Sequence, residues 1–357
     1  MKRLVTILGS LFLSIAIVGI QANPHASQSR LSQGKWVKIQ VNESGVYCLT
    51  YDQLRQAGLD PAKTHVYGYG GAMLPTQWAD GAIDDLPQVG CIRLNDRILF
   101  YGQGSFSWKY EPLQEIFTHT RNPYSDKGYY FLSDVETPQP DLVYAPAISS
   151  ANAEVIDAYT AYQVHEKDIL NLLDPAGVDG GGREFYGETL SPNSPLSISL
   201  PFSQIVSDDI HCRVMIAGVA KSFSQTEVKM GAESKKIATA PCSDHYTFGT
   251  PATLSTSFPA TGTGNQSVSI TFLNTESGSK GYLNYVEMSA TCSLTMNGAW
   301  LAFRTPAHLY ENTTLAYRIS NANSQTIILD ITHLDDIKAV PTTMEGNPLV
   351  FYANNED

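Results

Sequence analysis

A strict alternation of apolar and polar residues dominates the middle of the sequence. Apolar side chains occupy every second position in residues 196–202 and 210–216, and the same period recurs at 268–272 and 286–294. A period of two places the apolar side chains on one face of a β-strand, and the segments between these runs are rich in Gly, Ser, Thr and Asn. The pattern predicts an antiparallel, jelly-roll-like β-sandwich over residues 153–296.

A smaller β-rich domain is predicted before the sandwich, over residues 30–145. Residues 37–41 alternate in polarity, a turn follows, and residues 46–49 are strand-forming again, which indicates a β-hairpin. Two further strands are expected at residues 97–101 and 129–132, separated by a loop. The chain as a whole is therefore expected to be mainly β.

One short helix and two boundaries complete this outline. Thr50 and Gln53 have the spacing of a capping box, and the helix that they begin is expected to end at Gly58. Residues 138–152 are rich in Pro, Ala and Ser and are interpreted as a linker. Residues 297–357 contain more strand-forming runs and are interpreted as a further β-rich segment.

The first residues have the form of a signal peptide. Lys2 and Arg3 precede an uncharged run over residues 4–20, and Ala22 supplies the small residue expected at a cleavage point. We therefore expect a signal peptide over residues 1–22, followed by a mobile polar leader. A retained anchor is the alternative, since about 20 apolar residues are enough to span a bilayer. In either case the chain is expected to be exported.

The charge of the chain excludes some partners. Removing Lys2 and Arg3 lowers the basic count from 23 to 21 against 35 acidic residues, so the mature chain has a net charge of −14. Such an acidic surface argues against nucleic acid or anionic lipid as a partner. Three acidic residues lie close together in one loop, where they would form either a calcium site or, as such clusters more often do, a solvated turn: Asp80, Asp84 and Asp85.

Five cysteines follow the predicted signal peptide, in a compartment that permits oxidation: Cys48, Cys91, Cys212, Cys242 and Cys292. No two have C-x-x-C spacing, and none has a histidine at metal-ligand spacing, so neither a zinc site nor a redox-active pair is expected. Cys212 and Cys292 are both predicted to face the core. They are either joined in a disulfide or present as two buried thiols.

No motif assigns a catalytic, cofactor-binding or metal-binding residue, and no cofactor is expected. His211 and Cys212 are neighbours on one predicted strand, so their side chains point to opposite faces and cannot form a dyad. Cys242 and His245 form the remaining Cys–His pair, but nothing beside them in sequence would lower the pKa of the thiol. A G-x-S-x-G nucleophile motif is absent from the sequence.

Two pairs of carboxylates have the residue types of a glycosidase site. Glu166 with Asp168, or Glu184 with Glu188, would suit this chemistry if the fold placed the two groups about 5–10 Å apart. A related alternative is an independent surface adhesin or carbohydrate-binding sandwich, which the 19 tyrosines together with Trp108 and Trp300 would suit.

Several segments in a fixed order resemble one family. They are residues 45–54 (GVYCLTYDQL), 66–71 (VYGYGG), 84–87 (DDLP), 98–104 (ILFYGQG), 122–125 (NPYS), 165–168 (HEKD), 182–188 (GREFYGE), 283–287 (LNYVE) and 330–332 (DIT). Together they are similar to the N-terminal, non-catalytic region of the PorU-type sortases of type IX secretion systems, which are gingipain-like cysteine peptidases. The similarity runs from about residue 36 to about residue 352, and Phe185 stands where the family commonly has Trp.

The resemblance implies a protein of the outer membrane and cell surface, with other secretion-system subunits as partners. Sortases of this family remove the C-terminal sorting signals of secreted cargo and attach the cargo to surface lipopolysaccharide. Their catalytic Cys and His lie beyond the region of similarity, so no residue here inherits a catalytic role. We therefore expect a fragment or truncated form that is inactive alone and would meet its cargo only through the missing catalytic domain.

Overall fold

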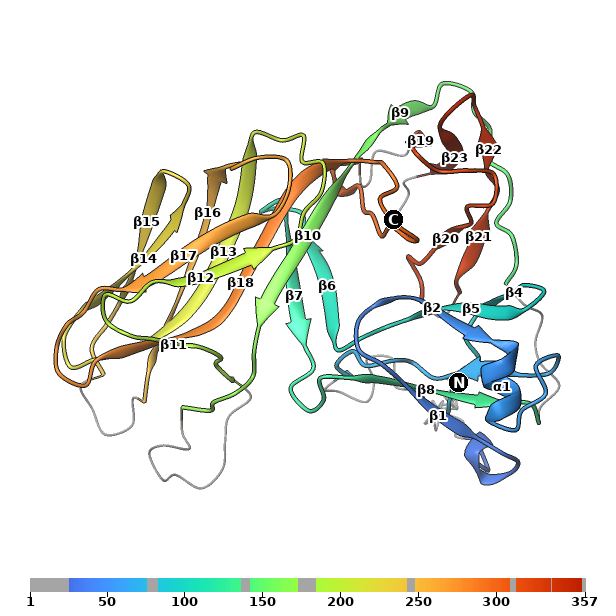
Figure 1. Ribbon diagram of the computed structural model, residues 1–357, viewed down its shortest axis with the longest axis horizontal. Helices are drawn as coiled ribbons and strands as arrows, with labels where there is room; N and C mark the ends of the chain where they lie inside the picture. Colours follow the sequence, from blue (N-terminus) through green and yellow to red (C-terminus); the bar gives the residue numbers. More distant parts are fainter. Residues whose placement is uncertain are drawn as a thin grey trace, which may run out of the picture.

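The computed structural model describes residues 26–75, 83–135, 142–172, 184–242, 248–308, 313–334 and 336–354. Strands account for most of its regular structure (Figure 1). The fold is thus mainly β, as the sequence predicts. Residues 1–22, the predicted signal peptide, lie outside the described residues. In the part of the chain that is described, no helix is long and apolar enough to cross a membrane.

The N-terminal region contains two small sheets and one helix. One sheet has the order β1-β8-β3 and the other the order β2-β5-β4. The elements are β1 (Val37–Val41), β2 (Gly45–Thr50), α1 (Tyr51–Gln56), β3 (His65–Tyr67), β4 (Cys91–Arg93), β5 (Arg97–Gly102) and β8 (Gly128–Ser133). Their buried residues form one core, which includes Val41, Leu54, Ile98, Phe100 and Leu132.

The predicted helix is confirmed, but the predicted hairpin is wrong. Thr50 Oγ1 accepts a hydrogen bond from the Gln53 amide at 3.2 Å, and the Thr50 amide donates to Gln53 Oε1 at 2.9 Å, which completes the capping box. Gly58 follows the helix with a φ of +73°, a conformation that favours glycine. In contrast, β1 pairs with β8 and β2 pairs with β5, so the two strands on either side of the turn belong to different sheets.

Residues 26–34 are the described part of the predicted mobile leader, and they are held against the rest of the N-terminal region. A short 3-10 turn, η1 (Arg30–Ser32), lies against the loop that holds Asp84 and Asp85. Asp85 accepts hydrogen bonds from the Arg30 amide at 2.7 Å and from the Ser29 hydroxyl at 3.3 Å. These carboxylates therefore bind the chain's own N-terminal segment. Asp80, the third candidate calcium ligand, lies outside the described residues.

A two-stranded hairpin extends from the N-terminal region toward the sandwich (Figure 1). It consists of β6 (Phe106–Glu111) and β7 (Ile116–Arg121), and in the described structure neither strand pairs with another sheet. The sequence predicted a loop that contains Trp108, between the strands at residues 97–101 and 129–132. Instead, Trp108 lies on β6 directly opposite His119 on β7.

The sandwich consists of two packed sheets. The first has the order β10-β18-β13-β16, with a short strand on β18: β10 (Ala158–Glu166), β11 (Thr189–Leu190), β13 (Asp209–Val219), β16 (Thr250–Pro259) and β18 (Lys280–Ser293). The second has the order β12-β17-β14-β15: β12 (Leu196–Leu200), β14 (Ser224–Met230), β15 (Glu233–Thr239) and β17 (Gln266–Phe272). The predicted inward residues Ile198, Val214, Ile270 and Val286 are all buried between the sheets.

Cys212 and Cys292 are two separate buried thiols. The register places Cys212 opposite Met288, and Cys292 lies further along β18, opposite Tyr159. Neither cysteine forms a disulfide, and Cys48, Cys91 and Cys242 are likewise thiols. Of the two alternatives for this pair, the structure therefore supports the buried thiols, and the disulfide does not form.

The C-terminal strands form a further sheet beside the sandwich. The sheet has the order β22-β23-β19-β9, and a separate pair, β20-β21, lies next to it. The elements are β9 (Glu154–Ile156), η3 (Pro306–His308), β19 (Thr314–Ile319), β20 (Ile328–Asp330), β21 (Lys338–Val340), β22 (Thr343–Met344) and β23 (Leu349–Asn354). Leu315, Tyr317 and Phe351 join the same apolar cluster as the sandwich core, so the two units share one core.

Candidate functional site

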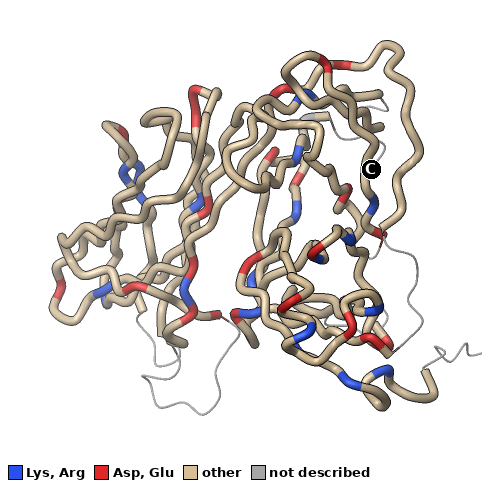
Figure 2. Tube along the Cα trace, turned by 45° about the vertical axis from the view of Figure 1, so that its right-hand side comes forward, with Lys and Arg blue, Asp and Glu red and all other residues tan. Residues whose placement is uncertain are grey.

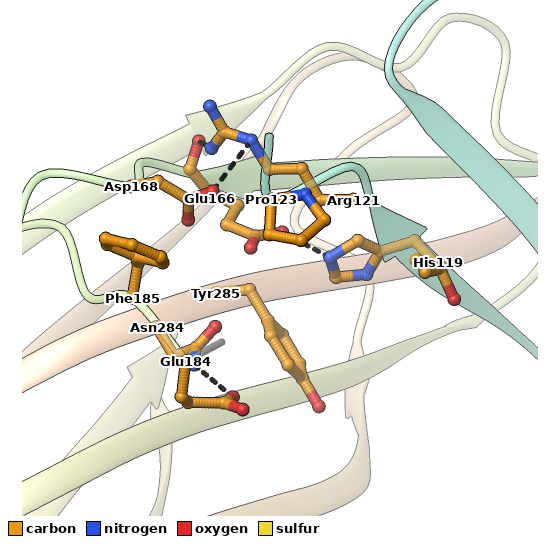
Figure 3. A pocket seen from close by; sticks show the side chains of 10 residues that line it. His119, Arg121, Pro123, Glu166, Asp168, Glu184, Phe185, Asn284 and Tyr285 are labelled. Carbon is orange, nitrogen blue, oxygen red and sulfur yellow. Dashed lines mark hydrogen bonds and ion pairs between the residues drawn. The ribbon is translucent and has the colours of Figure 1, made fainter. Parts of the chain in front are cut away.

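A cavity of about 270 Å³ lies where the β6–β7 hairpin meets the sandwich. Its lining comes from four parts of the chain: β7 and the turn after it, the end of β10, the segment before β11, and β18 (Figure 3). The lining residues are His119, Thr120, Arg121, Pro123, Glu166, Asp168, Glu184, Phe185, Asn284 and Tyr285. The cavity therefore joins residues that are distant in sequence. Elsewhere, acidic and basic residues are interspersed along the chain (Figure 2).

His119 lies at the centre of the charged groups. Its Nε2 is 2.5 Å from Glu166 Oε2, and its Nδ1 forms a hydrogen bond with Glu287 Oε1. The backbone amide of His119 donates to the same Glu287 oxygen at 2.9 Å. Only 4% of each of the His119 and Glu287 side chains is exposed, so this contact is almost fully removed from water. One histidine thus bridges the neighbouring strands β10 and β18.

Strand register explains why these side chains meet. Glu166 on β10 is opposite Tyr285 on β18, and Arg213 on β13 is opposite Glu287 on β18. Because side chains alternate between faces, the polar residues at these positions point away from the sandwich core while Val214, Val286 and Met288 point into it. The outer face of the sheet therefore presents a row of charged groups, and the hairpin covers it.

Two arginines balance the carboxylates. Arg213 Nη1 forms an ion pair with Glu287 Oε2, and its Nη2 donates to the Tyr285 hydroxyl at 3.1 Å. Arg121 lies on the hairpin side, where Nη1 donates to the Glu166 carbonyl oxygen at 3.0 Å and Nε is 3.2 Å from Asp168 Oδ2. The buried carboxylates are thus paired with cations from both the hairpin and the sheet, as buried charges require.

Aromatic rings pack around the charged groups. The Trp108 and Tyr162 ring centroids are 4.4 Å apart, and those of Phe117 and Tyr162 are 4.5 Å apart. Tyr285 meets the His119 ring edge-on at 5.0 Å. These rings exclude water from the contact, and a less polar surrounding strengthens the ion pairs inside it.

The surroundings raise the pKa of both His119 and Asp168, but for different reasons. Burial alone would lower the pKa of His119, but hydrogen bonds to Glu166 and Glu287 outweigh it and raise the pKa to about 9. Burial raises the pKa of the Asp168 carboxyl, Arg121 opposes the rise, and the nearby charges of Glu166 and Glu184 add to it. At neutral pH His119 is consequently an imidazolium. A protonated histidine holds carboxylates but cannot accept a proton as a general base.

Among the described residues, neither a cysteine nor a serine lines the cavity. Within the same ranges, no three His, Cys, Asp or Glu side chains are placed to hold a metal ion. Asn284 Nδ2 donates to Glu184 Oε1 at 2.8 Å, so this carboxylate is held by an amide (Figure 3). The arrangement is chemically suited to holding two parts of the protein together.

The carboxylates singled out in the sequence fall into two places. Glu166, Asp168 and Glu184 all line the cavity, but the first two are engaged by His119 and Arg121. Glu188 lies apart from the cavity lining, where Oε1 accepts from His165 Nε2 at 2.9 Å and pairs with Lys167 Nζ at 2.8 Å. Although burial opposes it, the hydrogen bonds from Lys167 and His165 lower the pKa of Glu188.

The cysteine candidates are also accounted for. His211 and Cys212 point to opposite faces as predicted: His211 is 3.1 Å from the Ser255 hydroxyl on the outer face, and Cys212 is in the core. Cys242 donates to the Gly218 carbonyl oxygen at 3.3 Å. His245, its proposed partner, lies outside the described residues.

Three central residues were not singled out from the sequence: His119, Arg213 and Glu287. They come from separate strands, β7, β13 and β18. Arg213 and Glu287 occupy outward positions that a period-two pattern assigns to solvent, and His119 lies on a strand without such a pattern. The sequence contained one indication that this face of the sheet is covered. The outward positions of β18 also include Tyr285, and an aromatic residue on the polar face indicates that a second layer covers it.

Comparison with solved structures places this fold among PorU-like proteins. Over 93% of its length, the chain matches the crystal structure of dimeric latent PorU from Porphyromonas gingivalis with a TM-score of 0.81 and 26% sequence identity. The chain therefore has a PorU-like fold, as its sequence motifs predicted. The match covers 31% of the length of PorU, so the chain spans about a third of that protein.

Two other comparisons are far weaker. The CBM36-1 domain of a xylanase from a Trinervitermes trinervoides hindgut metagenome matches 40% of the chain and all of its own length, with a TM-score of 0.24 and 14% identity. A β-porphyranase from Bacteroides plebeius covers 73% of the chain and 35% of its own, with a TM-score of 0.25 and 10% identity. TM-scores this low carry no argument about function. No family model matches the sequence, and no curated protein matches it.

Proposed function

We propose that this chain is a non-catalytic scaffold and docking region of a type IX secretion system sortase. The likeness to PorU over 93% of the chain is the observation that supports this proposal most directly. In a full-length protein the region would hold a catalytic domain at the outer membrane. That domain would cleave C-terminal sorting signals from cargo and attach the cargo to surface lipopolysaccharide.

The chemistry of the described residues agrees with a scaffold. The cavity at the β6–β7 hairpin is lined by mutually paired charges, and the imidazole among them is protonated at neutral pH. Cysteine acyl transfer needs a thiolate beside a histidine that can take up a proton. Burial instead raises the pKa of Cys212 to about 12 and that of Cys292 to about 11, which keeps both thiols protonated.

The proposal is tested by competition in a bacterium that secretes through a type IX system. An excess of this chain should occupy docking positions of the resident sortase, so that cargo accumulates with its sorting signal uncleaved. The matched control is Ile216→Asp, which places a charge in the sandwich core and should abolish both folding and competition. Unchanged cargo processing at a high level of folded chain would contradict the docking role.

A second experiment separates the scaffold from its alternatives. The purified chain is incubated with a peptide that carries a cargo cleavage junction, and separately applied to a glycan array. We expect neither cleavage nor glycan binding, and we expect envelope cross-linking to recover other secretion subunits. Cleavage that is lost when one cysteine is replaced would overturn the non-catalytic assignment. Specific glycan binding without recovered subunits would favour the carbohydrate-binding alternative.

A further inference from the structure

The β6–β7 hairpin is joined to the sandwich by side chains alone. Among the described strands, β6 and β7 pair only with each other, so no backbone ladder ties the hairpin to the sheet on which it rests. The hairpin belongs in sequence to the N-terminal region, yet it lies against β10 and β18 of the sandwich (Figure 1). A contact of this kind can separate as a unit without breaking either sheet.

Two kinds of contact hold the hairpin in place. Trp108 and Phe117 pack on Tyr162, which supplies an apolar contribution. The polar contribution comes from His119 and Arg121, which together engage the side chains of Glu166 and Glu287 and the backbone of Glu166. Glu166, Asp168 and Glu287 are thus each paired with a basic side chain from the hairpin or from the same sheet.

Whether the hairpin stays docked on the sheet depends on the charge of His119. Docking removes Glu166 and Glu287 from water, with only 10% and 4% of their side chains exposed. Removing one partner of a buried ion pair is strongly unfavourable, because the remaining charge is left uncompensated in a site without water. Without the imidazolium, Glu287 would keep Arg213, but the Glu166 carboxylate would face Asp168, because Arg121 pairs with Asp168 and bonds only to the backbone of Glu166. Separation would return these carboxylates to water.

We propose that the β6–β7 hairpin is a latch between the N-terminal region and the sandwich, held closed by the positive charge of His119. Loss of that charge releases the hairpin from the outer face of the sheet and uncovers Tyr162, Tyr285 and Glu287. The N-terminal region then stays attached through other contacts, including the packing of Trp300 against Gly45. The latch therefore sets the angle between two folded parts.

The latch can be observed through one backbone amide. The His119 amide donates to Glu287 and not to β6, so its protection from hydrogen exchange depends on docking. In His119→Gln, we expect the protection of this amide and of the β7 segment to fall at least about tenfold, while β13, β18, β5 and β8 keep theirs. His211→Gln is the matched control, since His211 is on the outer face of the same sheet but bonds to Ser255. It should leave β7 protection unchanged.

A charge-restoring variant and the unaltered protein complete the test. His119→Lys should recover part of the lost protection, because the charge is restored without the ring. Equal loss in the Lys and Gln variants would show that charge is not what closes the latch, and so would unchanged protection in the Gln variant. If the Gln variant fails to fold, the unaltered protein decides: β7 protection factors should fall as pH rises from neutrality through about 9, ahead of those of β13 and β18. If the protection factors of β7, β13 and β18 fall together as pH rises, the proposal is wrong.

The groups that face His119 make this pH test readable. They are Glu166 and Asp168 from the end of β10, Glu287 and Tyr285 from β18, Arg213 from β13 and Arg121 from β7 itself. Both arginines stay charged over this range, and burial raises the pKa of the Tyr285 phenol. His119 is therefore the group of the latch that changes charge between neutrality and about pH 9.

Discussion

One oxygen of Glu287 binds His119 twice, through the ring Nδ1 and through the backbone amide. The first contact fixes the charge of the imidazole, and the second fixes the position of β7. The other oxygen of the same carboxylate pairs with Arg213. A single side chain of the sandwich thereby holds a strand from another part of the protein, and this arrangement makes its replacement informative.

Glu287→Gln should destabilise the protein by about 3–5 kcal/mol, because His119 and Arg213 would then face each other with no carboxylate between them. The unfolding free energy is measured by urea denaturation. Glu233→Gln serves as control: this glutamate is half exposed and 4.0 Å from Lys235. Its replacement should cost less than about 1 kcal/mol. Equal effects of the two variants would contradict the buried network.

The two histidines over this sheet should titrate on opposite sides of the ordinary value of 6.5. Burial and the charge of Arg213 lower the pKa of His211, whereas that of His119 rises to about 9. NMR of the imidazole nitrogens should therefore show His119 protonated and His211 neutral at neutral pH. Ordinary titration of both rings would mean that the ion pairs do not form in solution.

The raised pKa of His119 also sets the sign of a stability change with pH. The folded state binds this proton more tightly than the unfolded chain, whose histidine titrates near 6.5. The contribution of His119 is fully present below about 6.5 and is lost as pH rises through about 9. Thermal unfolding across this window should show declining stability, and the decline should shrink in His119→Gln.

Ile216 tests the register of the sandwich. Its side chain is fully buried on β13, next to a β-bulge between Met215 and Ile216. Ile216→Ala should cost roughly 2–5 kcal/mol in unfolding free energy. Ser257→Ala on the exposed outer face of β16 is the control and should change stability by less than about 0.5 kcal/mol. A small effect at Ile216 would show that the strand register is wrong.

Thiol reactivity tests the absence of the disulfide. Cys48 is exposed, whereas Cys212 and Cys292 are buried and their pKa values are raised to about 12 and about 11 by burial. An alkylating reagent at neutral pH should modify Cys48 in the folded protein and reach Cys212 and Cys292 only after unfolding. A covalent Cys212–Cys292 link found by mass spectrometry of the unreduced protein would contradict the structure.

The sandwich was predictable because one of its faces is uniformly apolar. The alternation at β12, β13, β17 and β18 placed the inward residues correctly, since a single misplaced step would have exposed every apolar side chain. Strand β16 was missed because its inward positions are mostly small or polar, and β6 because its residues are half-buried on both faces. Period alone does not reveal strands of this kind.

The charged site was only partly predictable, and for a different reason. Glu166, Asp168 and Glu184 were singled out as carboxylates, but their partners lie on strands that the sequence does not connect to them. His119 meets Glu166 only because β7 crosses the outer face of β10 and β18. Which element covers a sheet is decided by tertiary packing, and no local pattern around His119 specifies it.

The pairing of β9 with β19 has a consequence for the order of folding. Glu154 is beside Leu315 in a parallel pair, with the entire sandwich between them in sequence. During synthesis β9 emerges long before its partner, and closing so long a loop costs conformational entropy that only later contacts repay. The sandwich can fold first, and its folding brings the two ends of that loop together. The C-terminal sheet would then be the last part of the chain to gain protection during refolding, with β9 exposed until that moment.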